Sequence, residues 1–226
     1  MSANITLRFA TVDVHHDDGI VISTLAGGAK LWVVYPPTTH NISSLARFYS
    51  NPNALFENSF STFQNGILVV QRDGQTLYIP PNCPHFVFTL SSCILFGCEI
   101  TPPSIFVGRI KSLHATVASA RSSGTKKLEE YLLSFIRGLE AALMDITSVD
   151  PVLNAWVQEA DYIGSVFTTD GKAVLACLEN VWRKFFRTTS LTSCPACGTI
   201  SGEFDHHFQS SHLAFLPFKN QRRGRS

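Results

Sequence analysis

Three side chains that lie far apart in the chain form the pattern with the clearest chemical meaning. His15 and Asp17 are two residues apart in the segment His15-His16-Asp17-Asp18, and His85 follows much later. Two histidines and one carboxylate are the ligands of a facial triad, which holds Fe(II) and leaves the other coordination positions open for a cosubstrate and dioxygen. The pattern therefore predicts an iron centre that activates oxygen.

The segment around His15 contains two candidate ligand pairs. Residues two apart share one face of a β-strand. His15 and Asp17 therefore point to one side and His16 and Asp18 to the other, and only one pair can face the interior of a barrel. The alternation of side chains along a strand does not decide which of the two pairs binds the metal. His85 must come from another strand, which a barrel can place opposite the first.

A second group of metal-binding residue types lies near the C-terminus. Cys194 and Cys197 form a Cys-x-x-Cys motif, and His206, His207 and His212 follow it. The cysteines can share one tight turn and His207 and His212 one helical face, which would complete a structural zinc site of the Cys2His2 type. His206 competes with His207 as the third ligand. The alternative is a free dithiol beside exposed histidines.

The spacing of this group argues against reading of DNA bases. The interval from Cys197 to His207 is shorter than the roughly twelve residues of a DNA-reading finger. A redox-active dithiol is also disfavoured, because no thioredoxin-like strand and helix surround the motif. Residues 191–216 are therefore expected to form a small zinc knuckle.

Composition excludes several other classes of protein. The 226 residues are 45% hydrophobic and 15% charged, so the chain can bury a core and is not disordered. The formal charge of +1 gives no global reason to expect nucleic-acid binding. No secretory signal is visible, and no apolar run approaches the roughly 20 residues of a membrane helix. The other cysteines follow no regular spacing and are expected to be reduced thiols in a cytoplasmic or nuclear protein.

The last residues, 217–226, form a basic tail. Its cationic residues are Lys219, Arg222, Arg223 and Arg225. Such a tail is typical of a nuclear-targeting or phosphate-contacting segment, and equally of a solvated terminus. Nuclear localisation and contact with nucleic acid have only this tail in their favour.

Short runs of β-branched and aromatic residues up to residue 107 predict a barrel or sandwich. The expected strands are 20–22, 31–35, 67–71, 76–79, 86–90 and 93–98, with about one strand in 4–14 and a helical or irregular excursion in 43–60. Asp73-Gly74 between two runs predicts a β-hairpin. In 108–190, apolar periodicity predicts helices over 125–146 and around 174–185, and Asp150-Pro151 predicts the start of another.

Three segments in this order resemble the JmjC family of Fe(II)- and 2-oxoglutarate-dependent oxygenases. They are 14–17 with the metal motif, 28–37 with Gly-x-Lys-x-Trp, and 74–85 with Gly-Gln-Thr-Leu-Tyr-Ile-Pro and the final histidine. The matching stretch runs from about 12 to 100 and is most similar to fungal members, whose motif often reads His-His-Asp. The resemblance implies an α+β chain with a double-stranded β-helix (jelly-roll, cupin-like) over 1–107.

Carried over position by position, the resemblance makes His15, Asp17 and His85 the iron ligands. It makes Lys30 the cation that holds the distal carboxylate of 2-oxoglutarate, which would be costly to bury without a partner. The expected reaction is hydroxylation or demethylation of a protein substrate, such as a histone methyl-lysine.

Other residues in the matching segments have weaker expectations. Thr24 or Ser23 is expected to add a hydrogen bond to the cosubstrate, and Asn41 is expected to be a turn residue rather than a ligand. His85 as a structural histidine and Lys30 as a surface lysine remain the alternatives to their predicted roles.

The chain departs from the family pattern before its metal motif. Only fourteen residues precede His15, whereas the family has supporting strands and helices there. We therefore expect apolar surface or a sheet edge to be exposed on the barrel. The alternative function is a catalytically impaired remnant that serves as a chromatin or protein interaction module.

Overall fold

The computed structural model describes residues 2–51, 60–200 and 203–218. Contacts divide the chain into two compact units, Met1–Gly124 and Thr125–Ser226. The first unit therefore extends past the barrel boundary expected at residue 107 and includes the helix that follows it. The basic tail from Lys219 onwards lies outside the described residues.

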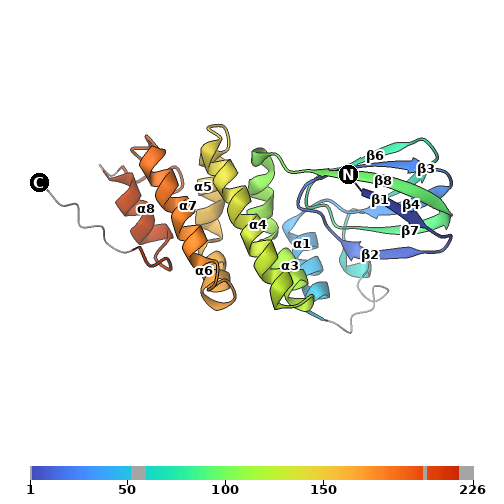
Figure 1. The fold of residues 1–226 in the computed structure, drawn as a ribbon, viewed down its shortest axis with the longest axis horizontal. Helices are drawn as coiled ribbons and strands as arrows, with labels where there is room; N and C mark the ends of the chain where they lie inside the picture. Colours follow the sequence, from blue (N-terminus) through green and yellow to red (C-terminus); the bar gives the residue numbers. More distant parts are fainter. Residues whose placement is uncertain (1, 52–59, 201–202, 219–226) are drawn as a thin grey trace, which may run out of the picture. The chain divides into compact units, whose positions relative to one another are not determined.

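In the described part of the first unit, two four-stranded antiparallel sheets pack as a jelly-roll-like sandwich (Figure 1). The strands are β1 (Ser2–Thr6), β2 (Thr11–His15), β3 (Ile20–Ala26), β4 (Ala29–Val34), β5 (Ile67–Arg72), β6 (Thr76–Ile79), β7 (His85–Ser91) and β8 (Cys93–Ile100). One sheet has the order β1-β8-β3-β6 and the other β2-β7-β4-β5. The expected fold class is confirmed.

Two local expectations for the strands were wrong. The Asp73-Gly74 turn joins β5 to β6, but β5 pairs with β4 and β6 pairs with β3, so the turn crosses between sheets and closes no hairpin. The turn is held by a bond from the Gly74 amide to the Leu25 carbonyl, 2.8 Å, at the end of β3. Residues 4–14 likewise form no single strand, because the chain turns at Phe9 (φ 69°) and passes from β1 into the other sheet.

Two helices accompany the sheets of the first unit. Helix α1 (Thr39–Ser50) begins earlier than the expected excursion, since the Thr38 side chain caps it by accepting from the Asn41 amide. The remainder of the segment 43–60, which was expected to be helical or irregular, includes residues 52–59, outside the described part. The short helix η1 (Phe60–Thr62) follows. After η2 (Pro103–Ile105), α3 (Phe106–Ser122) packs against α1. Val14, Val33, Leu45 and Ala115 share one core, which joins both helices to β2 and β4.

The second unit is helical. Its described helices are α4 (Thr125–Met144), α5 (Val149–Gln158), α6 (Ala160–Thr169), α7 (Leu175–Thr188) and α8 (Phe204–His212). The predicted helices at 125–146 and 174–185 are confirmed, whereas α6 was not predicted. Helix α5 starts before Asp150, because the Val152 amide already bonds to the Ser148 carbonyl, 3.0 Å. None of the described helices is long and apolar enough to cross a membrane.

The stability of the second unit should depend on the buried face of α4. Leu132 is fully buried there, whereas Met144 of the same helix is 42% exposed. Leu132→Ala is expected to lower the free energy of unfolding by about 2–5 kcal/mol, because it removes buried surface and leaves a cavity. Met144→Ala should change it by less than about 0.5 kcal/mol. Urea denaturation followed by circular dichroism measures both, and equal losses would contradict the burial of this face.

Candidate metal centres and the pocket between the sheets

The two candidate histidine ligands lie on neighbouring strands. His15 is the last residue of β2 and His85 the first of β7, and the two are cross-strand partners. Their ring centroids are 4.2 Å apart. His85 thus comes from another strand, as expected, and that strand is the direct neighbour of β2 in the same sheet. Pairing across the sheet places both rings on the same side because directly opposed residues share a face.

Backbone hydrogen bonds orient both rings. The Nδ1 of His15 donates to the Asp13 carbonyl, 2.8 Å, and the Nδ1 of His85 to the Cys83 carbonyl, 2.9 Å. A carbonyl only accepts, so Nδ1 carries the proton and each Nε2 keeps its lone pair. Burial, together with the neighbouring His15, lowers the pKa of His85 to about 4. Both rings are therefore held in the tautomer and orientation that a metal ion requires.

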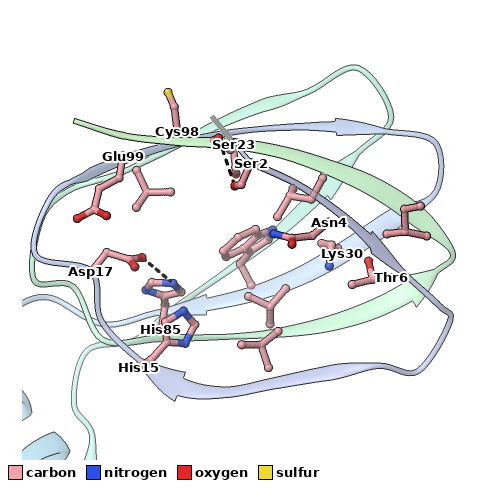
Figure 2. A pocket seen from close by; sticks show the side chains of 17 residues that line it. Ser2, Asn4, Thr6, His15, Asp17, Ser23, Lys30, His85, Cys98 and Glu99 are labelled. Atoms are coloured by element: carbon pink, nitrogen blue, oxygen red, sulfur yellow. Dashed lines mark hydrogen bonds and ion pairs between the residues drawn. The ribbon is translucent and has the colours of Figure 1, made fainter. Parts of the chain in front are cut away.

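Asp17 brings the carboxylate to these rings from the loop between β2 and β3. Its Oδ2 lies 3.6 Å from the Nε2 of His85, and the ligand atoms of His15, Asp17 and His85 all lie within 4.8 Å of one another (Figure 2). The strand argument does not apply to Asp17, since β2 ends at His15. Instead, the Asp17 carbonyl accepts from the Asn82 amide, 2.8 Å, which ties this loop to the turn before His85.

The alternative pair turns toward helix α3. The Nε2 of His16 lies 2.9 Å from the Thr116 hydroxyl, and Asp18 pairs with Arg109 at 3.1 Å. Both partners belong to α3. Within the described residues, the grouping that could hold a metal contains His15 and Asp17 and not His16 and Asp18. The sequence alone left both pairs open as metal ligands. The contacts of His16 and Asp18 with α3 decide between them in favour of His15 and Asp17.

A pocket of about 770 Å³ lies between the sheets, and the three candidate ligands are part of its wall. Lys30 lies across the pocket from them, near Asn4 and Thr6 (Figure 2). Its side chain is only 2% exposed, and Nζ donates to the Thr89 hydroxyl, 3.2 Å. Burial lowers the pKa of Lys30. Among the described residues no carboxylate pairs with this ammonium, so the pocket holds a buried cation suited to an anionic ligand.

Of the two candidate hydroxyls, Ser23 faces the pocket and Thr24 does not. Ser23 is 1% exposed and lines the pocket, and its Oγ has no hydrogen-bond partner among the described residues. Thr24 is on the other face of β3, where its hydroxyl bonds that of Thr76 at 2.8 Å. Of the two residues that the sequence analysis named, Ser23 therefore remains the candidate. Asn41 is a structural residue, since its amide group bonds to the carbonyls of Pro36 and Gln64.

Two residues near the candidate ligands were missed by the sequence analysis. Glu99 lines the pocket and accepts from the Gly19 amide at 2.8 Å, and burial raises its pKa. Asn82 is buried with a φ of 61°, and its Oδ1 accepts from the Ser112 hydroxyl of α3, 2.8 Å. The signal for Asn82 was its position between prolines, where Asn tolerates a left-handed conformation.

Asn82 is expected to control the position of Asp17 through the turn it occupies. Asn82→Ala should cost about 1–3 kcal/mol, because alanine is strained at this φ and leaves the Ser112 hydroxyl with only its longer bond to the Arg109 carbonyl, 3.4 Å. Asn82→Gly loses the same acceptor without the strain and should cost less. Thermal unfolding and Fe(II) titration of both variants test this. Equal stability of the two variants would show that the backbone conformation carries no cost.

The C-terminal cysteines and two of the three histidines also come together. The ligand atoms of Cys194, Cys197, His207 and His212 lie within 4.8 Å of one another. His206 is exposed and is not in this group. Hydrogen bonds from Thr199 lower the pKa of Cys197 to about 5. The four residues could hold a second metal ion.

Comparison with known proteins agrees with the fold of the first unit. A cupin-like jelly roll with a His-Asp-His cluster between its sheets is the class of domain that the first unit represents. Residues 2–106 match the family model of the JmjC domain. No curated protein matches the chain.

Solved structures with a similar part include two cupin proteins of low sequence identity. Drosophila melanogaster CENP-C bound to CAL1 has a TM-score of 0.30 and 6% identity over 43% of this chain and 59% of that chain. Bacillus subtilis oxalate decarboxylase has a TM-score of 0.29 and 11% identity over 43% of this chain and 20% of that chain. The match thus spans about three fifths of the one chain and a fifth of the other.

Proposed function

We propose that the chain is an Fe(II)- and 2-oxoglutarate-dependent dioxygenase that hydroxylates or demethylates a protein substrate. One observation carries the proposal: the candidate ligands His15, Asp17 and His85 line the same pocket as the buried cation of Lys30. An anionic cosubstrate that chelates the metal at one end needs a cation at its other end, and this pocket offers both.

The donor set fits ferrous iron. Two neutral imidazole nitrogens and one carboxylate oxygen are the ligands of the facial triad of non-haem Fe(II) oxygenases, and three ligands from one side leave positions for other molecules. When bound, Fe(II) activates dioxygen, and 2-oxoglutarate is decarboxylated to succinate as the substrate C–H bond is oxidised. Zinc in a closed site would require a fourth protein ligand, which the described residues do not add to this group.

The remaining wall of the pocket supports this assignment. Lys30 would bind the distal carboxylate of 2-oxoglutarate, because its buried ammonium otherwise lacks an anionic partner. The Ser23 hydroxyl, which has no partner among the described residues, would donate to the same carboxylate. Trp32 and Val87 line the pocket as apolar residues and would exclude water from the reacting groups.

The direct test is turnover of the cosubstrate by the whole chain. Purified protein supplied with Fe(II), 2-oxoglutarate and oxygen should form succinate even without a protein substrate, at a slow uncoupled rate. Omission of iron or oxygen should stop it. Protein that binds Fe(II) and 2-oxoglutarate but forms no succinate, alone or with peptides, would overturn the assignment as an enzyme.

The substrate class is proposed to be protein, with histone tails as the first candidate and the nucleus as the compartment. Peptides carrying methyl-lysine can be screened by mass spectrometry for the loss of a methyl group or the gain of one oxygen atom. Products on free amino acids and not on peptides would contradict a protein substrate.

A second candidate is a non-catalytic interaction module. It is favoured by apolar side chains exposed at β1 and the turn after it: Ile5 is 79%, Leu7 71% and Phe9 62% exposed. Exposed apolar patches on a folded unit mark sites for partner proteins. Normal folding with neither iron uptake nor 2-oxoglutarate binding would favour this module over the enzyme.

A further inference from the structure

We propose that Cys194, Cys197, His207 and His212 bind one structural zinc ion, which fixes helix α8 to the cysteine turn. All four residues belong to the second unit, so the site is separate from the proposed oxygenase centre in the first. A result that contradicts one proposal would therefore not contradict the other.

The two cysteines lie on a tight turn that backbone bonds close. The Gly198 amide donates to the Cys194 carbonyl, 2.8 Å, and the Cys194 amide donates to the Thr199 carbonyl, 3.0 Å. Gly198 has a φ of 69°, which favours glycine, and Ser193 pairs with Ile200 as an antiparallel bridge. This turn presents both sulfur atoms from one short loop, as a Cys-x-x-Cys zinc knuckle requires.

The two histidines come from helix α8, with His212 as its last residue. The Nε2 of His207 lies 3.2 Å from the Cys197 sulfur, and the Nε2 of His212 lies 3.7 Å from the Cys194 sulfur. In a tetrahedral zinc site, Zn–S bonds of about 2.3 Å and Zn–N bonds of about 2.0–2.1 Å separate the ligand atoms by roughly 3.3–3.8 Å. The separations of 3.2 and 3.7 Å are close to this range, and all four ligand atoms lie within 4.8 Å of one another.

The ligand types select the metal and its role. Two thiolates and two imidazoles suit zinc and disfavour magnesium and calcium, which prefer oxygen ligands. Four protein ligands fill a tetrahedral site and leave no position for water or substrate. The site is therefore structural rather than catalytic.

Helix α8 needs such support because it has only nine residues. A helix of this length is not stable by itself in water. One side of α8 packs Phe204 and Phe208 against aromatic residues of α7, with Phe208 5.3 Å from Trp182 between ring centroids. Zinc would hold the histidine side, so that the metal and the aromatic core together fix the helix.

The experiment measures metal content and helix protection in the whole chain. It uses a His85→Ala background, so that zinc in the other site does not contribute to the count. After reconstitution with zinc, mass spectrometry should find one zinc per chain in the background, and Co(II) in its place should give thiolate charge-transfer absorption and strong tetrahedral d–d bands. Cys197→Ser and His207→Gln should each reduce zinc retention at least tenfold.

The chain offers two matched controls, one cysteine and one histidine outside the ligand group. Cys177→Ser replaces an exposed cysteine of α7, and His206→Gln replaces the exposed neighbour of His207. Both should retain zinc and the Co(II) bands. Removal of zinc by a chelator should raise amide hydrogen exchange in 204–212 while 2–51 stays unchanged.

Two results would overturn the proposal. In the first, the reconstituted protein binds no zinc or shows no thiolate–cobalt absorption band, although hydrogen exchange shows that 204–212 is helical. The other is zinc retention that Cys197→Ser and His207→Gln lower no more than the two controls do. Because Cys197 is exposed, its replacement by serine should not by itself prevent folding.

Discussion

Replacement of His85 by alanine is expected to abolish iron-dependent succinate formation. The variant removes one of three protein ligands, so affinity for Fe(II) should fall by more than the 10–100-fold typical of losing a residue that only orients a ligand. Asp17→Asn should have a similar effect with less disturbance, since asparagine keeps the size of the side chain and Asp17 is partly exposed. Fe(II) titration under nitrogen and a succinate assay measure both effects.

Residues of the same type outside the pocket serve as controls. His40→Ala replaces an exposed histidine of α1, and Asp13→Asn replaces an exposed aspartate of β2 whose contact with His15 is made by its backbone carbonyl. Neither should change iron affinity or turnover by more than about twofold. Full turnover in folded His85→Ala would exclude the three-ligand centre.

Replacement of Lys30 by methionine should have opposite effects on cosubstrate binding and on stability. Truncating one partner of a buried charge pair costs about 2–5 kcal/mol, so KM for 2-oxoglutarate should rise by roughly 30-fold or more. Without cosubstrate, the same change removes a buried ammonium that no carboxylate neutralises among the described residues. The free energy of unfolding should therefore stay within about 1 kcal/mol of the parent or increase.

The two measurements together distinguish an anchoring lysine from a structural one. Lys111→Met, on the exposed side of α3, should change neither KM nor stability. A structural role for Lys30 would instead lower stability and leave KM for 2-oxoglutarate unchanged. Calorimetry of 2-oxoglutarate binding to the iron-loaded protein gives the loss of affinity independently of turnover.

Much of the fold could be predicted from sequence because its signals are local. Short runs of β-branched and aromatic residues predicted most strands, and the Cys-x-x-Cys spacing followed by His207 and His212 predicted the composition of the C-terminal cluster. In α4, apolar residues recur every three or four positions, and that helix has almost the predicted bounds. These features depend on residues near one another in the chain, and the periods of helices and strands are fixed by backbone geometry.

Tertiary structure alone decided the features that depend on which strands pair and which elements pack beside them. The turn at Asp73-Gly74 has the sequence of a hairpin, yet its two strands pair with different partners and enter different sheets. No local pattern contains that information, because each strand is stabilised by neighbours from elsewhere in the chain.

The same reason applies to the candidate site. His15 and Asp17 were separable from His16 and Asp18 only once α3 was found to hold the second pair through Thr116 and Arg109. Residue types determined which chemistry the chain could perform. The packing of α3 and the pairing of β2 with β7 determined which of those residues meet, because a ligand set exists only where separate segments converge in space.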